Sequence, residues 1–322
     1  MSDGARRSAL RIDANDAKRP NARAFVSAVI ARETLRDVAR ELGRAEIPVM
    51  PLKGVLLQLG VYAHDPAERT LTDVDVLVPE QCFFAAVELL ARRGYQPLSA
   101  GPSWIEAAFA APRGLPLDLH RRLFCPLRYQ LPTREVFQRA RCDHRALGVS
   151  IWLPDPRDTA AHLIGKVVTD HVLHDAAARF RDLEALVGHH RLAPEALGAH
   201  LCRTGLCRTA RHVLGRGVRE RGHPFYAAVL QHLPPNPRDA AVAALARPLC
   251  RLLEGGPLAP LPAHLLNTSL WRGAASLSLA AVYAAEHALL RRARGARGGQ
   301  WAAFFAPGNL SARRRASSAR AA

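Results

Sequence analysis

The sequence contains few lysines, no CxxC motif and no long apolar run. Of its 45 basic residues only Lys18, Lys53 and Lys166 are lysines, and none of its six cysteines forms a CxxC pair. Scattered thiols in apolar helical segments pack as small hydrophobic groups, so we expect all six cysteines to be reduced and structural. No segment reaches the ~18 uninterrupted apolar residues of a membrane helix, and the polar N-terminus does not resemble a signal peptide. These absences predict a cytoplasmic protein without membrane insertion.

Three familiar catalytic patterns are also missing, namely the phosphate loop, the nucleophile elbow and the dinucleotide-binding fingerprint. What the chain does have is a globular composition with an excess of positive charge: 49% hydrophobic residues, 23% charged residues and a formal net charge of +17. A basic surface attracts nucleic acid and triphosphates. However, residues 291–322 carry eight arginines and no acid. Nucleic acid is therefore a candidate partner of the basic surface, while the folded body is only moderately basic.

The chain is longer than one average domain, and its composition changes along its length. Residues 1–21 are polar with little periodicity and are predicted to be disordered. Residues 22–153 are predicted to form an α/β core preceded by a helix, and residues 154–292 an all-helical domain. Residues 293–322 form a basic tail that is predicted to be disordered.

Hydrophobic periodicity separates the expected helices from the expected strands. In the first domain we predict helices over 22–42, 54–62 and 81–93, and strands over 47–52, 74–78, 95–98, 104–109 and 115–120. In the second domain, segments rich in Ala, Leu, Arg and His predict helices over 156–173, 176–189, 194–204, 207–221, 237–253 and 270–293. The predicted fold class is α+β, with an α/β core followed by an all-helical C-terminal domain.

Three acids in or directly beside two of the predicted strands carry the most informative pattern. Asp73 and Asp75 are separated by one residue, so their side chains point to the same side of a strand. Their mutual repulsion is relieved by Mg²⁺, which takes oxygen ligands and shares its coordination shell with substrate phosphates. Asp118 lies in a later Leu-Asp-Leu strand and is expected to complete a two-metal site. Its alternative is an exposed acid paired with an arginine at 113, 121 or 122.

Four further residues are candidates for contact with a nucleotide. Lys53-Gly54 lies between a short strand and a helix, where backbone N–H groups can receive a phosphate and the lysine adds charge. Arg69, just upstream of the acids, could approach the triphosphate or the base, and its alternative is a solvated loop arginine. His120 shares a strand face with Asp118 and could touch the nucleotide or orient that acid. Its alternative is a structural hydrogen-bonding role.

Together these motifs resemble the polymerase-beta-type nucleotidyltransferase superfamily, which has a Gly-containing turn, a D-x-D strand and a later acid flanked by hydrophobic residues. More closely, residues 25–190 look like the bacterial family named as uncharacterised nucleotidyltransferases. The matching residues are Leu52-Lys53-Gly54, Tyr62, Asp65-Pro66, Arg69, Asp73-Val-Asp75-Val-Leu-Val78, Gly94-Tyr95 and Asp118-Leu-His120. The resemblance implies a minimal nucleotidyltransferase fold with a mixed sheet.

In that family the D-x-D acids and the later acid are taken as metal ligands, and the Gly turn as the phosphate contact. The resemblance therefore implies Mg²⁺ or Mn²⁺ held by Asp73, Asp75 and Asp118 as catalytic residues, with Gly54 and Lys53 at the phosphates. The chain departs from the superfamily at its turn, where Lys-Gly replaces the usual Gly-Ser or Gly-Gly. The interval from the turn to the D-x-D pair is also longer than usual, although it suits the Lys-Gly subfamily.

The predicted reaction is in-line attack by an acceptor oxygen on the α-phosphorus of a nucleoside triphosphate such as ATP, with release of pyrophosphate. The acceptor, whether a small molecule, a peptide or an RNA, is not indicated by any residue pattern. Two alternatives stay open at this point. One is a nucleotide-binding regulatory protein with weak or no catalysis, and the other is a toxin-like transferase that acts on tRNA.

Two polar clusters outside the main motifs each allow a functional and a structural interpretation. His162, His171, His174 and Asp175 could form a second metal site, but without an H-E-x-x-H motif a set of structural helix-face histidines is the favoured interpretation. The second cluster opens the following helix and consists of Arg179, Arg181 and Asp182. These residues could line a cleft against the catalytic face, although ordinary surface pairs are slightly favoured.

Overall fold

The computed structural model describes residues 22–98, 105–169 and 176–235, together with single positions at 242, 244, 274, 275, 278 and 282. The helices are α1 (Ala22–Gly43), α2 (Lys53–Leu59), α3 (Phe83–Arg92), α4 (Thr133–Arg139), α5 (Pro156–Thr169), α6 (Ala176–His190), α7 (Pro194–Arg203), α8 (Cys207–Arg221) and α9 (Pro224–Gln231). The strands are β1 (Met50–Pro51), β2 (Val74–Leu77), β3 (Gln96–Pro97), β4 (Glu106–Ala110), β5 (Leu117–His120), β6 (Arg141–Asp143) and β7 (Ile151–Leu153). Short 3-10 turns occur at Pro66–Glu68 and Glu80–Cys82.

Five strands form one mixed sheet in the order β1-β2-β5-β4-β3. Strands β2 and β5 are parallel, whereas the other neighbours are antiparallel. The mixed sheet next to helices confirms the predicted fold class. Strands β6 and β7 form a separate two-stranded sheet that the sequence pattern did not predict.

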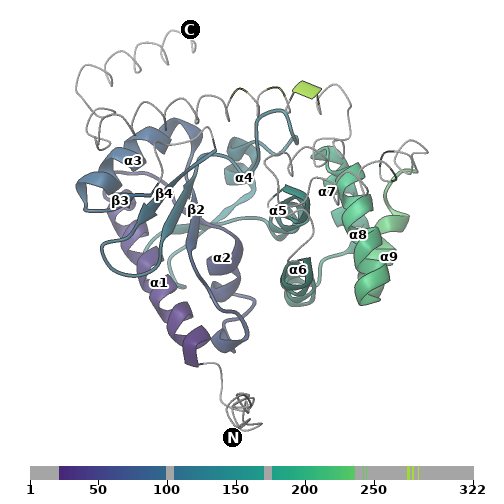
Figure 1. The fold of residues 1–322 in the computed structure, drawn as a ribbon, viewed down its shortest axis with the longest axis horizontal. Coiled ribbons are helices and arrows are strands. Elements are labelled where there is room, and N and C mark those ends of the chain that lie inside the picture. Colours follow the sequence, from purple (N-terminus) through teal and green to yellow (C-terminus); the bar gives the residue numbers. More distant parts are fainter. Residues whose placement is uncertain are drawn as a thin grey trace, which may run out of the picture.

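One face of the sheet packs against α1 and α3. Val74 and Val76 of β2, with Leu117 and Leu119 of β5, are fully buried in one hydrophobic cluster that also contains residues of these two helices. Figure 1 shows α1 and α3 together on one flank of the strands. Because side chains alternate along a strand, the intervening polar residues of β2 and β5 must point to the opposite face.

The opposite face of the sheet packs toward the helical part of the chain, α5 to α9, which lies on the other flank in Figure 1. A second hydrophobic cluster joins Met50, Leu57 and Leu77 of the sheet region to Ile164 of α5 and Phe180 of α6. This cluster crosses the predicted boundary between residues 153 and 154. The two predicted domains therefore share a hydrophobic cluster, and the division of the chain at this boundary stays a prediction.

The structure differs from the predicted elements mainly in short segments. The predicted strand over 47–52 is reduced to two residues, while α4 and α9 were not predicted. The predicted disorder of 1–21 and 293–322 lies outside the described residues, as do the helices over 237–253 and 270–293 apart from single positions. In the described ranges, no helix combines the length and apolarity that crossing a bilayer requires.

One prediction about the cysteines is wrong. Cys202 and Cys207 form a disulfide across the turn between α7 and α8, with their Cα atoms 4.8 Å apart. The turn brings them together because Gly205 adopts a left-handed backbone, with φ of 72°. Among the described residues, Cys82, Cys125 and Cys142 are free thiols, as predicted.

Candidate active site

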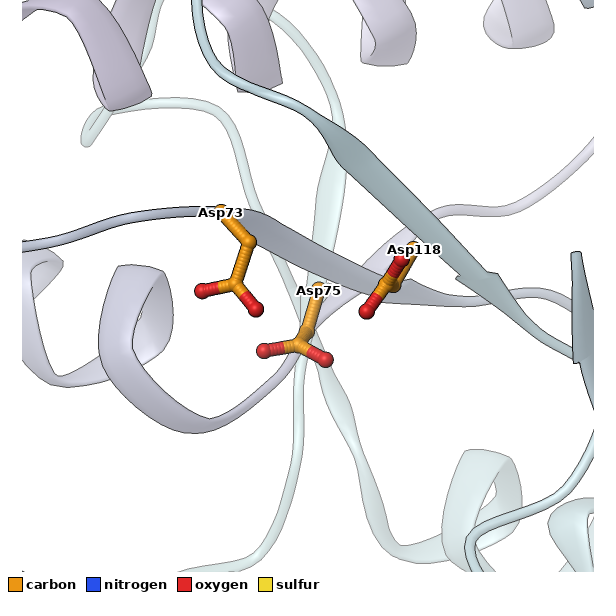
Figure 2. A group of neighbouring side chains, drawn as sticks. All are labelled: Asp73, Asp75 and Asp118. Atoms are coloured by element: carbon orange, nitrogen blue, oxygen red, sulfur yellow. The ribbon is translucent and has the colours of Figure 1, made fainter. Parts of the chain in front are cut away.

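Three carboxylates meet where β2 and β5 run side by side. Asp73 comes directly before β2, Asp75 lies within it, and Asp118 lies in β5. The parallel register pairs Asp75 with Asp118. One possible ligand oxygen from each residue lies within 4.8 Å of those of the other two, and Figure 2 shows the three side chains converging from the two strands. The structure thus brings together the acids that the sequence pattern placed on one face.

Asp75 is the most deeply buried of the three acids and has two partners. Its side chain is 5% exposed, and its Oδ1 lies 2.6 Å from Nζ of Lys53 and 2.8 Å from Nε2 of His120. Burial by itself would raise the pKa of Asp75, but the hydrogen bond with His120 and the charge of Lys53 outweigh burial and hold that pKa well below its usual range. Because both contacts use Oδ1, the Oδ2 atom of this ionised carboxylate remains available to a cation.

Asp118 and Asp73 are in a less favourable electrostatic environment. Burial, and then the negative charge of Asp75, raises the pKa of Asp118 to about 6. The same two causes raise the pKa of Asp73. A divalent cation between the three groups would relieve this repulsion, and carboxylate oxygens are the donors that Mg²⁺ and Mn²⁺ prefer. The residues present therefore fit a hard divalent metal.

The Lys53-Gly54 turn lies beside the acids and is conformationally unusual. Lys53 has a left-handed backbone with φ of 48°, which residues other than glycine rarely adopt. Gly54 is required for a different reason: a Cβ added to it would lie 2.5 Å from Nη1 of Arg69 and 2.6 Å from Cδ2 of Leu71. The missing side chain at position 54 is therefore what allows the Arg69 guanidinium to approach the turn.

Arg69 is held in place by the helical part of the chain. Its Nε and Nη2 donate hydrogen bonds of 2.9 and 2.8 Å to the carboxylate of Asp182 in α6. The Tyr62 hydroxyl donates to the same carboxylate at 3.0 Å. Arg69 is therefore part of a fixed network, and the alternative of a solvated loop arginine is wrong.

His120 lies behind Asp75. The residue is 1% exposed, its Nε2 contacts Asp75, and its Nδ1 lies 3.2 Å from Oε2 of Glu106. It therefore orients Asp75, whereas the sequence suggested Asp118 as the acid it would orient. His120 does not line the cavity described next, so this geometry gives no support to the predicted nucleotide contact and favours the structural hydrogen-bonding alternative.

A cavity of about 1360 Å³ opens in front of the acids. The sheet region and the Lys53-Gly54 turn provide one wall, and residues of α5 and α6 provide the other. Small-molecule pockets are typically ~300–1,000 Å³, so this volume can hold a nucleoside triphosphate and part of an acceptor. The cationic side chains that line it are Lys53, Arg69, Lys166, Arg179 and Arg181.

The favoured interpretation of Arg179, Arg181 and Asp182 as ordinary surface pairs is wrong. All three line the cavity, and Asp182 is only 3% exposed. The sequence contained one signal for the buried position of Asp182, which is an acid between Phe180 and Leu183 on an amphipathic helix. A carboxylate on an apolar face needs a cation from another element. No local pattern marked the other polar residues of the wall that the sequence analysis missed, which are Glu68, Thr70, Thr72, Glu106, Lys166 and Glu184.

The proposed histidine metal site is only partly within the described residues. His162 is 3% exposed and packs edge-on against Phe124, with ring centroids 5.4 Å apart, which fits the structural interpretation. His171, His174 and Asp175 lie outside the described residues. Within the described part of the chain, the only group of three or more metal-ligating side chains is the aspartate trio.

A mixed sheet that gathers a D-x-D pair and a third acid at a polar cavity is the arrangement of a nucleotidyltransferase-type protein. Residues 16–214 match the family described as uncharacterised nucleotidyltransferases, and the chain belongs to that family. No curated protein matches the chain. Among solved structures, it is similar to an antigenic nucleotidyltransferase-like protein from Paracoccidioides brasiliensis, with 13% identity, a TM-score of 0.43, and coverage of 63% of this chain and 93% of that one.

Proposed function

We propose that this protein transfers a nucleoside monophosphate from a nucleoside triphosphate to an acceptor, in a metal-dependent reaction that releases pyrophosphate. The observation that carries the proposal is the convergence of three carboxylates at a cavity whose other lining residues include five cationic side chains. The acids suit a divalent cation and the cationic residues suit a triphosphate, so the cavity matches both charged parts of a metal–nucleotide substrate. Membership in a nucleotidyltransferase family supports the reaction class.

Asp73, Asp75 and Asp118 would hold Mg²⁺ or Mn²⁺, which when bound supplies positive charge to the phosphates and to the leaving pyrophosphate. Lys53 and His120 keep Asp75 ionised and fix its Oδ1. Asp118 would also accept the proton of the acceptor hydroxyl, because it lies at the cavity opposite Asp75 in the neighbouring strand. These roles follow from each group's position and charge.

The bond changes are those of an in-line displacement. The acceptor oxygen forms a bond to the α-phosphorus, while the bond from that phosphorus to the bridging oxygen breaks and its electron pair leaves with pyrophosphate. The Lys53-Gly54 turn and Arg69 line the cavity beside the acids, where they would hold the triphosphate in line with the acceptor.

The test is incubation with each of labelled ATP, CTP, GTP and UTP in Mg²⁺ or Mn²⁺, followed by measurement of pyrophosphate and of label on RNA, protein and small-molecule acceptors. We expect Asp73→Asn and Asp118→Asn to lower the rate by at least ~100-fold, because each removes a main electrostatic contributor. Asp37→Asn is the matched control, because Asp37 is a surface residue of α1 with a side chain 58% exposed.

Three outcomes separate the candidate functions. Metal-dependent nucleotide binding without transfer to any acceptor would favour the nucleotide-binding regulatory alternative. Transfer of the label to tRNA alone would identify the protein as the toxin-like alternative, a transferase that acts on tRNA. Full activity in Asp73→Asn and Asp118→Asn would refute the metal-dependent mechanism.

A further inference from the structure

We infer that Asp182 is a positioning residue for the donor nucleotide, because it orients Arg69 toward phosphate groups bound at the Gly54 turn. The inference rests on the proposed function of the same site. Asp182 would not touch the substrate itself. It would act through Arg69, which lines the cavity beside the acids.

The geometry fixes the plane of the Arg69 guanidinium. Nε lies 2.9 and 3.0 Å from the two carboxylate oxygens of Asp182, and Nη2 lies 2.8 Å from Oδ2. A two-point contact of this kind leaves a planar guanidinium little freedom to rotate. The remaining nitrogen, Nη1, then lies against Gly54, at 2.5 Å from the place where a Cβ would be. One edge of Arg69 is thus held by α6, and Nη1 is directed to the phosphate-binding turn.

Burial explains why Arg69 and Asp182 depend on each other. The side chains are 26% and 5% exposed, respectively, and a buried charge without a partner is costly. Burial would lower the pKa of Arg69, but the hydrogen bonds and charge of Asp182 outweigh it and raise that pKa. Because the pair is neutral overall, we expect Asp182 to contribute the orientation of Arg69 and no net attraction for phosphate.

The contact also joins two distant parts of the chain. Arg69 follows the 3-10 turn Pro66–Glu68 in the sheet region, whereas Asp182 lies in α6, 113 residues away. Tyr62, which follows α2, donates to the same carboxylate. The phosphate site would therefore be complete only when α6 is packed against the sheet region. The affinity for phosphate groups would then depend on that packing.

The first experiment measures binding of Mg²⁺–tripolyphosphate and of each Mg²⁺–nucleoside triphosphate to the full chain. We expect Asp182→Asn and Arg69→Lys each to weaken both kinds of ligand by about tenfold, because one hydrogen-bonded orientation is lost. The double variant should be little worse than either single variant, because both changes disrupt one contact. Tripolyphosphate has no base. If each variant loses the same affinity for tripolyphosphate as for the nucleotides, Arg69 contacts the phosphate groups.

The matched control is Asp158→Asn. Asp158 is 1% exposed and forms an equally buried two-point pair with Arg139, at 2.9 and 3.0 Å, but it does not line the large cavity. This variant should lose stability as Asp182→Asn does, yet keep its affinity for tripolyphosphate. If Asp182→Asn does not fold, Asp182→Glu tests the inference instead, because its longer side chain keeps a carboxylate for Arg69 but changes the position from which that carboxylate fixes the guanidinium.

Chemical rescue provides a readout that a purely structural role would not change. Guanidinium ion should restore part of the tripolyphosphate affinity of Arg69→Ala when Asp182 is present, and none when the second change Asp182→Asn is added. Wild-type affinity in a folded Asp182→Asn variant would overturn this inference alone. If the wild-type chain binds neither tripolyphosphate nor any nucleotide, the proposed function fails together with it.

Discussion

At the scale of single residues, the three acids differ in how well their charges are compensated. Asp75 is held ionised by Lys53 and His120. Asp118 instead has a pKa raised to about 6 by burial and by the charge of Asp75. The ionised form of Asp118 therefore destabilises the metal-free protein, and a bound divalent cation should reverse this effect.

Asp118→Asn should raise the melting temperature of the metal-free protein and remove most of its stabilisation by Mg²⁺ or Mn²⁺. The pKa of Asp118 rises from 3.8 to about 6 on folding, so its favourable contribution to stability is present below pH ~4 and lost as pH rises through ~6. The Asp118→Asn variant has no carboxyl group to ionise at this position, so it does not lose this contribution as the pH rises. At pH 7.5 without metal we expect it to melt about 2–4 °C higher than the wild type.

Differential scanning fluorimetry between pH 4.5 and 7.5, with and without metal, measures both effects. The advantage of Asp118→Asn should grow up to about pH 6 and then level off. Equal melting temperatures at pH 7.5, together with an unchanged response to metal, would show that Asp118 is not a ligand.

Gly54 provides a second test at the residue scale. Gly54→Ala places a Cβ within 2.6 Å of both Arg69 and Leu71. Because Arg69 is held by Asp182, it cannot move away freely. We expect a loss of about 1–3 kcal/mol in the free energy of unfolding, as in overpacked cores, and weaker nucleotide binding.

Gly188→Ala is the control for that substitution. Gly188 lies in α6, and an added Cβ would meet no atom within 4 Å, so alanine should be neutral or stabilising by up to about 1 kcal/mol. Urea denaturation of both variants gives the comparison. A Gly54→Ala variant as stable as Gly188→Ala would contradict the close packing at the turn.

At the scale of elements, the site depends on two neighbouring parallel strands and on helix α6. The D-x-D alternation in β2 and the Leu-Asp-Leu alternation in β5 were readable from the sequence, because side-chain direction in a strand is a local property. The pairing of β5 with β2, in a register that places Asp75 opposite Asp118, is seen only in the tertiary structure. The role of α6 was weighed but not favoured, because its cavity-facing residues, apart from the acid at Asp182, look like those of any amphipathic helix.

Helix α6 can be tested as a cavity wall by adding bulk to it. Ala178 lines the cavity, whereas its exposed neighbour Ala177 does not. Ala178→Trp should weaken Mg²⁺–nucleotide binding by at least about tenfold, because the indole occupies space that the ligand needs. Ala177→Trp should bind as the wild type does. Calorimetric titration of both variants measures the difference, and equal affinities would place the nucleotide elsewhere.

At the scale of the whole molecule, the sheet region and the helical part share a hydrophobic cluster that includes Met50, Leu77, Ile164 and Phe180. The Arg69–Asp182 contact crosses the same boundary. We therefore expect the full chain to unfold in one cooperative transition that includes both parts.

A fragment ending at residue 153 provides the test. Without α5 to α9 it would expose Met50, Leu57 and Leu77 to water, which costs about 1.5–3 kcal/mol for each large apolar side chain. We expect it to be insoluble or to lack a cooperative thermal transition by circular dichroism. A soluble fragment with a sharp transition would instead confirm the predicted boundary as one between independent domains.

The sequence by itself determined the alternation that puts Asp73 and Asp75 on one face, the matching alternation around Asp118, and the amphipathic helices of the second part. These features are fixed by backbone geometry over a few residues. Only the tertiary structure decided that Lys53 and His120 share one oxygen of Asp75 and that α6 holds Arg69 through a buried carboxylate. Such contacts join residues 22 to 113 positions apart, and they depend on how whole elements pack, which no local pattern encodes.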